Sequence, residues 1–270
     1  MRGDFMENLR LNNGVEMPLI GFGTYQMPAQ ITARCVLEAL EIGYRHVDTA
    51  QCYGNEREVG QAVRSSGLKR EEIFITTKLW GARGYRDTLT SIENSLRTLD
   101  IVYIDLLLIH EPTGDFNEIY RAMETKYHAG ELRSIGVANF LETNFNRLMT
   151  TAKIIPAVNQ IETHVFRQQS QMNRLLKKFG TAHESWSPLA CGKNGIFSNS
   201  TLTKIADAHG KTVAQVALKF LIRQDIPIIP KSTHAERMRE NFSITDFDLT
   251  AAEFAEIKTL DACKSLFAWW

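Results

Sequence analysis

Short runs of β-branched and other apolar residues alternate with segments of helical periodicity along almost the whole chain, and this alternation limits the possible folds more than any other feature. Strands that alternate with helices are typical of parallel sheets. Eight such units follow one another with no linker or break in composition, and they predict an α/β protein, a closed (β/α)8 TIM barrel of about 250 residues. A doubly wound sheet is the alternative. The expected strands span residues 19–23, 45–48, 73–77, 104–109, 134–138, 157–160, 182–187 and 226–229.

A separate element precedes these units. Residues 9–11 and 15–17 carry apolar side chains on either side of Asn13-Gly14, a dipeptide typical of a tight hairpin turn. We expect this hairpin to close the bottom of the barrel, so that residues 1–270 form one barrel domain. Capping boxes, in which two side chains satisfy free backbone N–H groups, predict three helix starts: Asn55 with Glu58, Asp115 with Glu118, and Thr212 with Gln215.

The composition is that of an ordinary globular protein, with 44% hydrophobic residues, and it excludes disordered and collagen-like chains. The 31 Lys and Arg residues balance 31 Asp and Glu residues. A neutral chain has no net field to attract a phosphate backbone or anionic lipid, so we expect neither nucleic acid nor a membrane as partner. The 4 cysteines are widely separated and the N-terminus lacks a signal-peptide pattern. We therefore expect a reduced, cytoplasmic protein, and a monomer.

Several binding motifs are incomplete. The run from Gly21 through Gly23 lacks the third glycine of a dinucleotide fingerprint, and Gly192-Lys193 lacks the flanking residues of a phosphate loop. Neither His110-Glu111 nor His183-Glu184 continues to the second histidine of a zinc-protease motif. These absences favour the barrel over a doubly wound sheet, and we expect no metal site.

In such a barrel, the residues that end each strand meet at one mouth, where the active site lies. Asp48, Lys78 and His110 end neighbouring strands, and Tyr53 follows in the loop after Asp48. A lysine ammonium favours the phenolate, so Lys78 is expected to lower the pKa of Tyr53 and make it a proton donor. Asp48 would hold the ammonium, and His110 would donate to a carbonyl oxygen. Each residue alone could have a purely structural role: Asp48 as a cap acceptor, Lys78 as a surface cation, Tyr53 as a loop aromatic and His110 as a core histidine. Their joint position at one barrel mouth favours catalysis.

These residues lie in four blocks: Asp48-Thr-Ala-Gln-Cys-Tyr53-Gly-Asn-Glu, Thr76-Thr-Lys78-Leu-Trp80, Asp105-Leu-Leu-Leu-Ile-His110 and Ile229-Pro-Lys231-Ser232. The blocks resemble the signature blocks of the aldo-keto reductase superfamily, in its bacterial diketo-gluconate reductase and glyoxal reductase branch. The resemblance extends from the hairpin to about Asn241. It implies a catalytic tetrad at Asp48, Tyr53, Lys78 and His110, and reduction of aldehydes or ketones by hydride transfer from NADPH with Tyr53 as proton donor.

The resemblance also implies cofactor contacts. Asn139 and Gln160 would bind the nicotinamide carboxamide, with Ala138 where the family usually has serine, and Trp186 would stack on the ring. A block after the eighth strand would bind the adenosine phosphate and favour NADPH over NADH, although His234 stands where relatives often have threonine. A solvated surface and plain barrel packing are the alternatives. The matching cofactor positions are Gly23, Thr24, Asn139, Gln160, Trp186, Ser187, Leu189, Lys231, Ser232, Arg237, Glu240 and Asn241.

The expected substrates are small aldehydes, ketoaldehydes or diketo sugar acids. An apolar wall suited to them would come from Phe22 and Trp80, with His110 and Glu111 beside it. Residues 191–200, rich in Gly, Asn and Ser, are expected to form a mobile loop over the cofactor. Three aromatic residues near the C-terminus are too apolar for a free tail and are expected to pack on the protein or close the pocket: Phe267, Trp269 and Trp270.

Two other functions are weighed against the same sequence features. An NADPH-binding redox sensor or partner subunit on the same fold would share the cofactor site, since fold does not dictate function. A metal-dependent barrel hydrolase or isomerase would need a cluster of His and carboxylate ligands at the strand ends, and the sequence lacks one.

Overall fold

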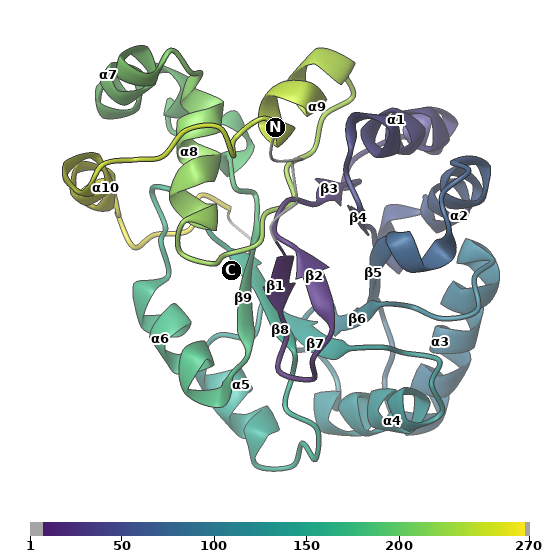
Figure 1. The fold of residues 1–270 in the computed structure, drawn as a ribbon. Coiled ribbons are helices and arrows are strands. Elements are labelled where there is room, and N and C mark those ends of the chain that lie inside the picture. The colour runs from purple at the N-terminus through teal and green to yellow at the C-terminus, as the bar shows by residue number, and fades with distance from the viewer. Residues whose placement is uncertain (1–7, 268–270) are drawn as a thin grey trace.

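A curled sheet of parallel strands forms the centre of the protein in a computed structural model, which describes residues 8–267. Its strands are hydrogen-bonded in chain order, from β3 to β9, and each is followed by at least one helix on the outside of the sheet (Figure 1). This is the predicted strand–helix alternation of a (β/α)8 barrel. The strands are β3 Phe22–Gly23, β4 His46–Asp48, β5 Phe74–Leu79, β6 Leu106–Ile109, β7 Ile135–Ala138, β8 Val158–Glu162 and β9 Ala182–Trp186.

Residues 226–229 close the barrel, although they form isolated bridges in place of the regular eighth strand that was expected. Ile228 bridges to Ile20 on one side and to Ser185 on the other. The Ile228 nitrogen donates to the Leu19 oxygen at 2.9 Å, and the Gly21 nitrogen donates to the Ile228 oxygen at 2.8 Å. Because these bonds join the first and last parts of the ring, no open edge remains there.

The predicted hairpin is present and covers the end of the barrel opposite the site. Strands β1 Asn8–Arg10 and β2 Glu16–Pro18 pair antiparallel, with Leu9 opposite Met17. Met17 is fully buried and packs in one apolar cluster with Phe74 and Leu106, which begin β5 and β6. The hairpin therefore fills the entrance at the amino ends of the strands, and Figure 1 shows it lying across the ring.

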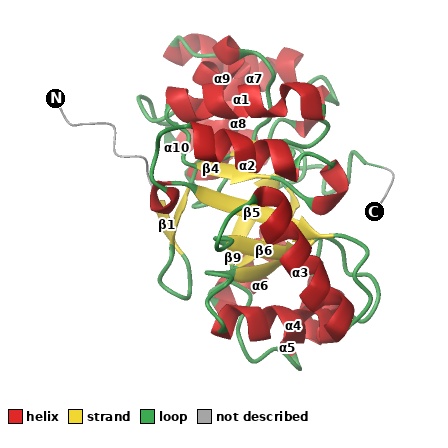
Figure 2. Ribbon diagram, turned by 90° about the vertical axis from the view of Figure 1, so that its right-hand side faces the viewer, coloured by secondary structure: helices red, strands yellow, loops and turns green. Residues whose placement is uncertain are grey.

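Helices surround the strands on the outside (Figure 2). Their buried faces and the outward faces of the strands share the larger apolar core. No helix in the described residues is long and apolar enough to cross a membrane. The helices are α1 Ala29–Ile42, α2 Glu56–Ser65, α3 Tyr85–Leu99, α4 Phe116–His128, α5 Glu142–Met149, α6 Ser170–Phe179, α7 Ser200–His209, α8 Val213–Ile222, α9 Ala235–Phe242 and α10 Ala251–Lys258.

One of the expected capping boxes forms completely, at Thr212 and Gln215. At Asp115 the side chain accepts the cap bond from the Glu118 nitrogen. The box expected at Asn55 is wrong. Asn55 is fully buried, and its side chain instead donates to the backbone oxygens of Thr24 and Met27 and accepts from Thr49. It joins the loops after β3 and β4, so tertiary contacts take the place of the local cap.

Candidate active site

A cleft of about 330 Å³ opens at the carboxyl ends of the barrel strands. Residues at or just after the carboxyl end of every barrel strand except β5 line this cleft. Lys78 of β5 does not line it, but it bonds to two residues that do, Asp48 and Tyr53. The cleft thus lies at the end of the barrel where the sequence predicts the site. The cleft is lined by Gly23, Tyr25, Gln26, Asp48, Tyr53, His110, Glu111, Asn139, Gln160, Trp186, Ser187, Pro188, Leu189, Cys191, Ile229, Pro230, Lys231 and Phe267.

A buried ion pair forms the floor of the cleft. Lys78 Nζ donates to Asp48 Oδ1 at 2.5 Å and to the Thr49 oxygen at 3.0 Å, and it lies 3.4 Å from the Tyr53 hydroxyl. The side chains of Asp48 and Lys78 are at most 2% exposed. Asp48 ends β4 and Lys78 lies near the end of β5, so the parallel register of the two strands brings them together. A buried cation needs such a partner, and Asp48 provides it.

The pKa of Tyr53 differs from the sequence-based expectation. Lys78 does favour the phenolate, but burial disfavours it more strongly, and the Asp48 carboxylate adds to that effect, so the net pKa is raised. Burial would lower the pKa of Lys78, but Asp48 and Tyr53 outweigh it and keep the ammonium charged. Tyr53 is therefore held as a neutral phenol beside a permanent cation, an arrangement that keeps its proton available.

His110, at the end of β6, adds a neutral imidazole to the same wall. Burial and the nearby Lys78 ammonium lower its pKa to about 3. Its ring lies 5.7 Å from the Tyr53 ring and 5.2 Å from the Trp80 ring, edge to face in both cases. The Cys52 thiol, whose pKa is raised to about 11 by desolvation, lies 3.5 Å from His110 Nδ1. A thiol that stays protonated can donate to Nδ1, which leaves Nε2 to carry the ring hydrogen.

A second buried carboxylate next to the cleft, Glu184, is bonded to Gln160 and was not among the predicted site residues. Gln160 Nε2 donates to Asp48 Oδ2 and to Glu184 Oε2, each at 2.9 Å. Burial and the charge of Asp48 raise the pKa of Glu184. Both amide hydrogens are thus used, which leaves the Gln160 oxygen for a ligand. A signal was present, since Glu184 is two residues before Trp186 in a strand whose side chains alternate between faces.

Asn139 links Trp186 to His110. Its Oδ1 accepts from Trp186 Nε1 at 2.8 Å, and its Nδ2 donates to the backbone oxygen of His110 at 3.0 Å. Asn139 and Ser187 both have positive φ, at 63° and 57°. Such conformations are uncommon away from glycine and concentrate at functional sites. The backbone is therefore bent at the points where it faces the cleft.

The cationic end of the cleft lies after the closing strand. Lys231 lines the cleft, and both Lys231 and Arg237 are exposed. Within residues 8–267, neither cation forms an ion pair with a carboxylate. Helix α9 begins at Ala235, between the two, so its free backbone N–H groups point to the same region.

Three predicted residues of this block are engaged within the protein. Ser232 is 7% exposed, and its hydroxyl accepts from the His234 nitrogen at 3.1 Å. The Glu240 carboxylate accepts from the Thr212 hydroxyl at 2.7 Å. Asn241 is 5% exposed. Ser232 and Glu240 thus form bonds within the protein and Asn241 is buried, while the two cations are exposed.

A family model described as "Aldo/keto reductase family" matches residues 19–262. The chain belongs to this family. Membership identifies it as an oxidoreductase of carbonyl compounds, in agreement with the resemblance recognised in the sequence. Within the described residues, no group of three or more His, Cys, Asp or Glu side chains is placed to hold a metal ion.

Similar proteins support the aldo-keto reductase assignment over the whole barrel. Glyoxal reductase from Bacillus subtilis is 40% identical over 258 residues, which are 94% of this chain and 93% of that protein. An aldo-keto reductase from a Medee basin deep-sea metagenome library has a TM-score of 0.94 and 43% identity, covering 96% of this chain and 97% of that one. The Bombyx mori aldo-keto reductase, solved in complex with NADP, has a TM-score of 0.90 and 32% identity, covering 96% and 94%.

Two predicted contacts of this aldo-keto reductase do not reach the cleft. Phe22 was expected in the substrate wall, but it is 1% exposed and packs edge to face on Tyr44 in the core, at 5.6 Å. Thr24 was expected at the cofactor, but it is fully buried and its hydroxyl donates to the Asp48 oxygen at 2.9 Å. Gly23 does line the cleft; a Cβ there would lie 2.7 Å from the Ile229 oxygen, so the close approach of β3 to the closing strand requires glycine.

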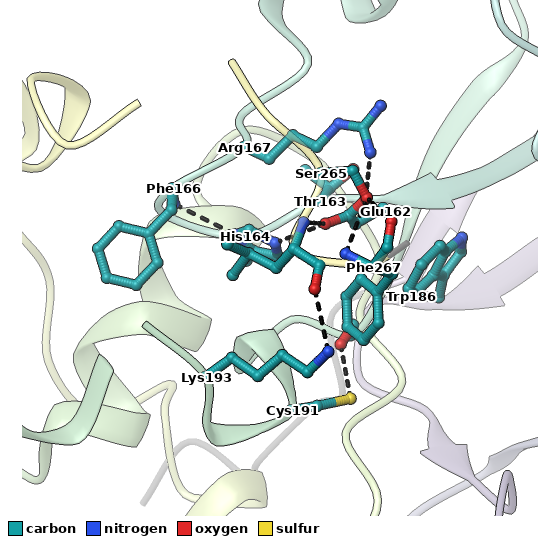
Figure 3. A network of polar contacts seen from close by, with 12 residues as sticks. Glu162, Thr163, His164, Phe166, Arg167, Trp186, Cys191, Lys193, Ser265 and Phe267 are labelled. Carbon is teal, nitrogen blue, oxygen red and sulfur yellow. Dashed lines mark hydrogen bonds and ion pairs between the residues drawn. The ribbon is translucent and has the colours of Figure 1, made fainter. Parts of the chain in front are cut away.

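The C-terminal segment of the reductase closes one side of the cleft. Phe267 is 7% exposed, lines the cleft and contacts Trp186 edge to face at 5.1 Å, as expected for an aromatic residue that packs on the protein (Figure 3). Trp269 and Trp270 lie outside the described residues. Residues 191–200 contain two short 3-10 turns, at Ala190–Gly192 and Ile196–Ser198. Cys191, the first residue of the loop expected over the cofactor, lines the cleft. Tyr25 and Gln26 also line it but were not predicted, because loops carry no periodicity.

Proposed function

We propose that the protein reduces small aldehydes and ketones to alcohols with NADPH, with Tyr53 as the proton donor. The observation that carries this proposal is the position of the Tyr53 hydroxyl, 3.4 Å from the buried Lys78 ammonium, in a cleft shared with neutral His110. A phenol, a fixed cation and a neutral imidazole supply what carbonyl reduction requires of the protein: a proton and stabilisation of charge on oxygen. When bound, NADPH supplies the hydride.

The donor set of the cleft fits a nicotinamide dinucleotide phosphate. At one end, the Gln160 oxygen can accept from the nicotinamide carboxamide, and Asn139 has one amide hydrogen and one oxygen lone pair left for the same group. Trp186, which also lines the cleft, provides an aromatic face for the ring. At the other end, Lys231, Arg237 and the start of α9 match a phosphate. We assign Gly23, Ser187 and Leu189, which line the cleft, to the cofactor as well.

The chain's own residues provide the proton path. Tyr53 donates its hydroxyl proton to the substrate oxygen, and the Lys78 ammonium stabilises the phenolate that remains. Asp48 holds the ammonium within hydrogen-bonding distance of Tyr53. His110 donates from Nε2 to the same oxygen and orients the carbonyl group. Glu111 lines the cleft on the substrate side. Trp80 does not line it, but its ring is 49% exposed and contacts the His110 ring at 5.2 Å, so we assign it to the substrate side as well.

A carbonyl panel tests the proposed function. Purified protein is mixed with methylglyoxal, glyoxal or 4-nitrobenzaldehyde, and oxidation of NADPH or NADH is followed by absorbance. Glyoxal is included because a relative carries the name glyoxal reductase. We expect turnover with NADPH on at least one small carbonyl compound. Tight NADPH binding without turnover on any of them would reject the proposal in favour of a cofactor-binding protein without reductase activity.

The pH dependence follows from the state of His110. Its pKa of about 3 keeps the imidazole neutral throughout the range from pH 5 to pH 8, whereas an unperturbed histidine would gain a proton below about pH 6.5. We therefore expect kcat/KM for the carbonyl substrate to show no inflection near pH 6.5. An acidic limb with a midpoint between about 6 and 7 that disappears in His110→Gln would contradict this.

Cofactor preference follows from Lys231. Its exposed ammonium lines the cleft, and a hydrogen bond between charged groups contributes about 1.5 to 3 kcal/mol. We expect Lys231→Ala to raise KM for NADPH by about 10-fold or more and to leave KM for NADH nearly unchanged. Lys204→Ala, which removes an exposed lysine paired with Glu256 on the outer helices, serves as the control. An equal rise for both cofactors would remove Lys231 from the phosphate site.

A further inference from the structure

Glu162 at the end of β8 is a buried carboxylate outside the catalytic tetrad, with donors on both oxygens. Its side chain is 2% exposed. Oε1 accepts from His164 Nε2 and from the Leu266 backbone nitrogen, each at 3.0 Å; Oε2 accepts from the Ser265 hydroxyl at 2.6 Å and pairs with Arg167 (Figure 3). Burial alone would raise the pKa of Glu162, but these donors lower it to about 2. Two of the donors come from the C-terminal segment, about 100 positions away in the chain.

Lys193 holds the same segment from the opposite side. Its Nζ donates to the Leu266 oxygen at 3.0 Å and lies 4.3 Å above the centre of the Phe267 ring (Figure 3). The N–H and C=O groups of Leu266 are thus bonded to charged groups on different elements. Residues 262–264, just before, are exposed. The bonds of Ser265 and Leu266 to charged side chains therefore hold this part of the segment against the barrel.

The fixed segment reaches the reacting groups through a continuous line of contacts. Phe267 lines the cleft and packs against Trp186, whose Nε1 donates to Asn139. Asn139 in turn donates to the backbone oxygen of His110. The hydroxyl of Ser265 also accepts from the Phe267 nitrogen at 3.0 Å, so the bond of Ser265 to Glu162 helps to set the direction of the Phe267 ring.

We propose that Glu162 is a positioning residue that holds residues 265–267 in place and so keeps the Phe267 ring in the cleft as a barrier against bulky carbonyl substrates. This inference rests on the proposed carbonyl reduction. A ring at this position narrows the cleft beside Trp186 and favours small carbonyl compounds. Glu162 itself does not line the cleft, so it acts on substrate choice only through Phe267.

The test compares kcat/KM for 2-naphthaldehyde with kcat/KM for methylglyoxal. Phe267→Ala should raise this ratio by about 10-fold or more, the scale on which pocket volume changes discrimination. Glu162→Gln keeps the shape but removes the charge, and it should raise the ratio in the same direction by about 3-fold or more. Ser265→Ala removes the bond to Glu162 from the other side and should also raise the ratio. Because Ser265 is less buried than Glu162, this variant tests the inference even if Glu162→Gln fails to fold.

A double variant separates positioning from general damage. In the Phe267→Ala background, Glu162→Gln should leave the ratio unchanged, because no ring remains to be displaced. Glu118→Gln, which removes an exposed carboxylate paired with Arg121 on the outer helix α4, is the matched control and should leave the ratio at the wild-type value. A ratio that does not change in Phe267→Ala, or effects of the two substitutions that simply add, would overturn the inference.

Digestion by a carboxypeptidase gives a readout that needs no activity. In the wild type, the enzyme should not remove Phe267, because its ring is buried and its backbone nitrogen donates to the Ser265 hydroxyl. In Glu162→Gln and Ser265→Ala, mass spectrometry should show that trimming continues past Leu266. Wild type that resists trimming but reduces no carbonyl compound would reject the proposed function and leave the anchoring intact. Equal trimming in all variants would reject the anchoring itself.

Discussion

Tyr53→Phe is expected to lower kcat for carbonyl reduction by about 10²-fold to 10⁴-fold, the contribution of a positioned general acid. The substitution removes the hydroxyl 3.4 Å from Lys78 Nζ and keeps the ring contacts with Tyr25 and His110, 5.0 Å and 5.7 Å away. Because the aromatic wall remains, NADPH should bind as in the wild type. Steady-state kinetics and fluorescence titration with NADPH measure the two effects separately.

The matched control for this prediction is Tyr85→Phe. It removes a phenol hydroxyl that bonds the Thr125 hydroxyl on the exposed surface of α3 and α4. It should leave kcat within about 2-fold, since exposed substitutions away from special features have small effects. If Tyr53→Phe kept more than about a tenth of wild-type kcat, the proton would come from another group. His110 is then the next candidate, because it lines the same cleft.

The ring of strands was predictable because each strand is defined by its own residues. Short runs of β-branched and other apolar residues are local signals, and all the parallel strands from β3 to β9 overlap their expected ranges. The eighth differs, because the bridges of Ile228 depend on how Ile20 and Ser185 approach it from both sides. Such pairing depends on tertiary structure, and the local sequence does not contain it.

The positions of the tetrad were also predictable, but their electrostatics were not. Parallel register places Asp48 and Lys78 together once their strands are assigned. The pKa of Tyr53 depends on the balance between desolvation and the opposing charges of Lys78 and Asp48, and the sequence shows the charges but not the burial. The sequence also does not show the direction of the Phe22 side chain. Strand β3 has only two residues, too few for a pattern that separates the side facing the cleft from the side facing the core.

The second large effect is expected from the ion pair beneath Tyr53. The Lys78 side chain is 1% exposed and is paired with Asp48 Oδ1. Asp48→Asn replaces this carboxylate with a neutral amide, so the buried ammonium loses its ion-pair partner. Removing one partner of a buried pair typically costs about 3 to 5 kcal/mol, because the remaining charge is desolvated without compensation. We expect a loss of this size in the free energy of unfolding, measured by urea denaturation at pH 7. Glu256→Gln, which breaks the exposed pair with Lys204, should cost at most about 1 kcal/mol.

The double variant Asp48→Asn with Lys78→Met shows why the pair is present. It removes both charges, so its loss of unfolding free energy should be smaller than the sum of the two single losses, and a buried pair replaced by neutral residues can be near neutral. Catalysis should not recover, because Tyr53 then has no ammonium to stabilise its phenolate. A stable, inactive double variant would mean that the pair serves proton donation more than folding. Single variants that each cost less than about 1 kcal/mol would instead show that the charges are not desolvated in the folded protein.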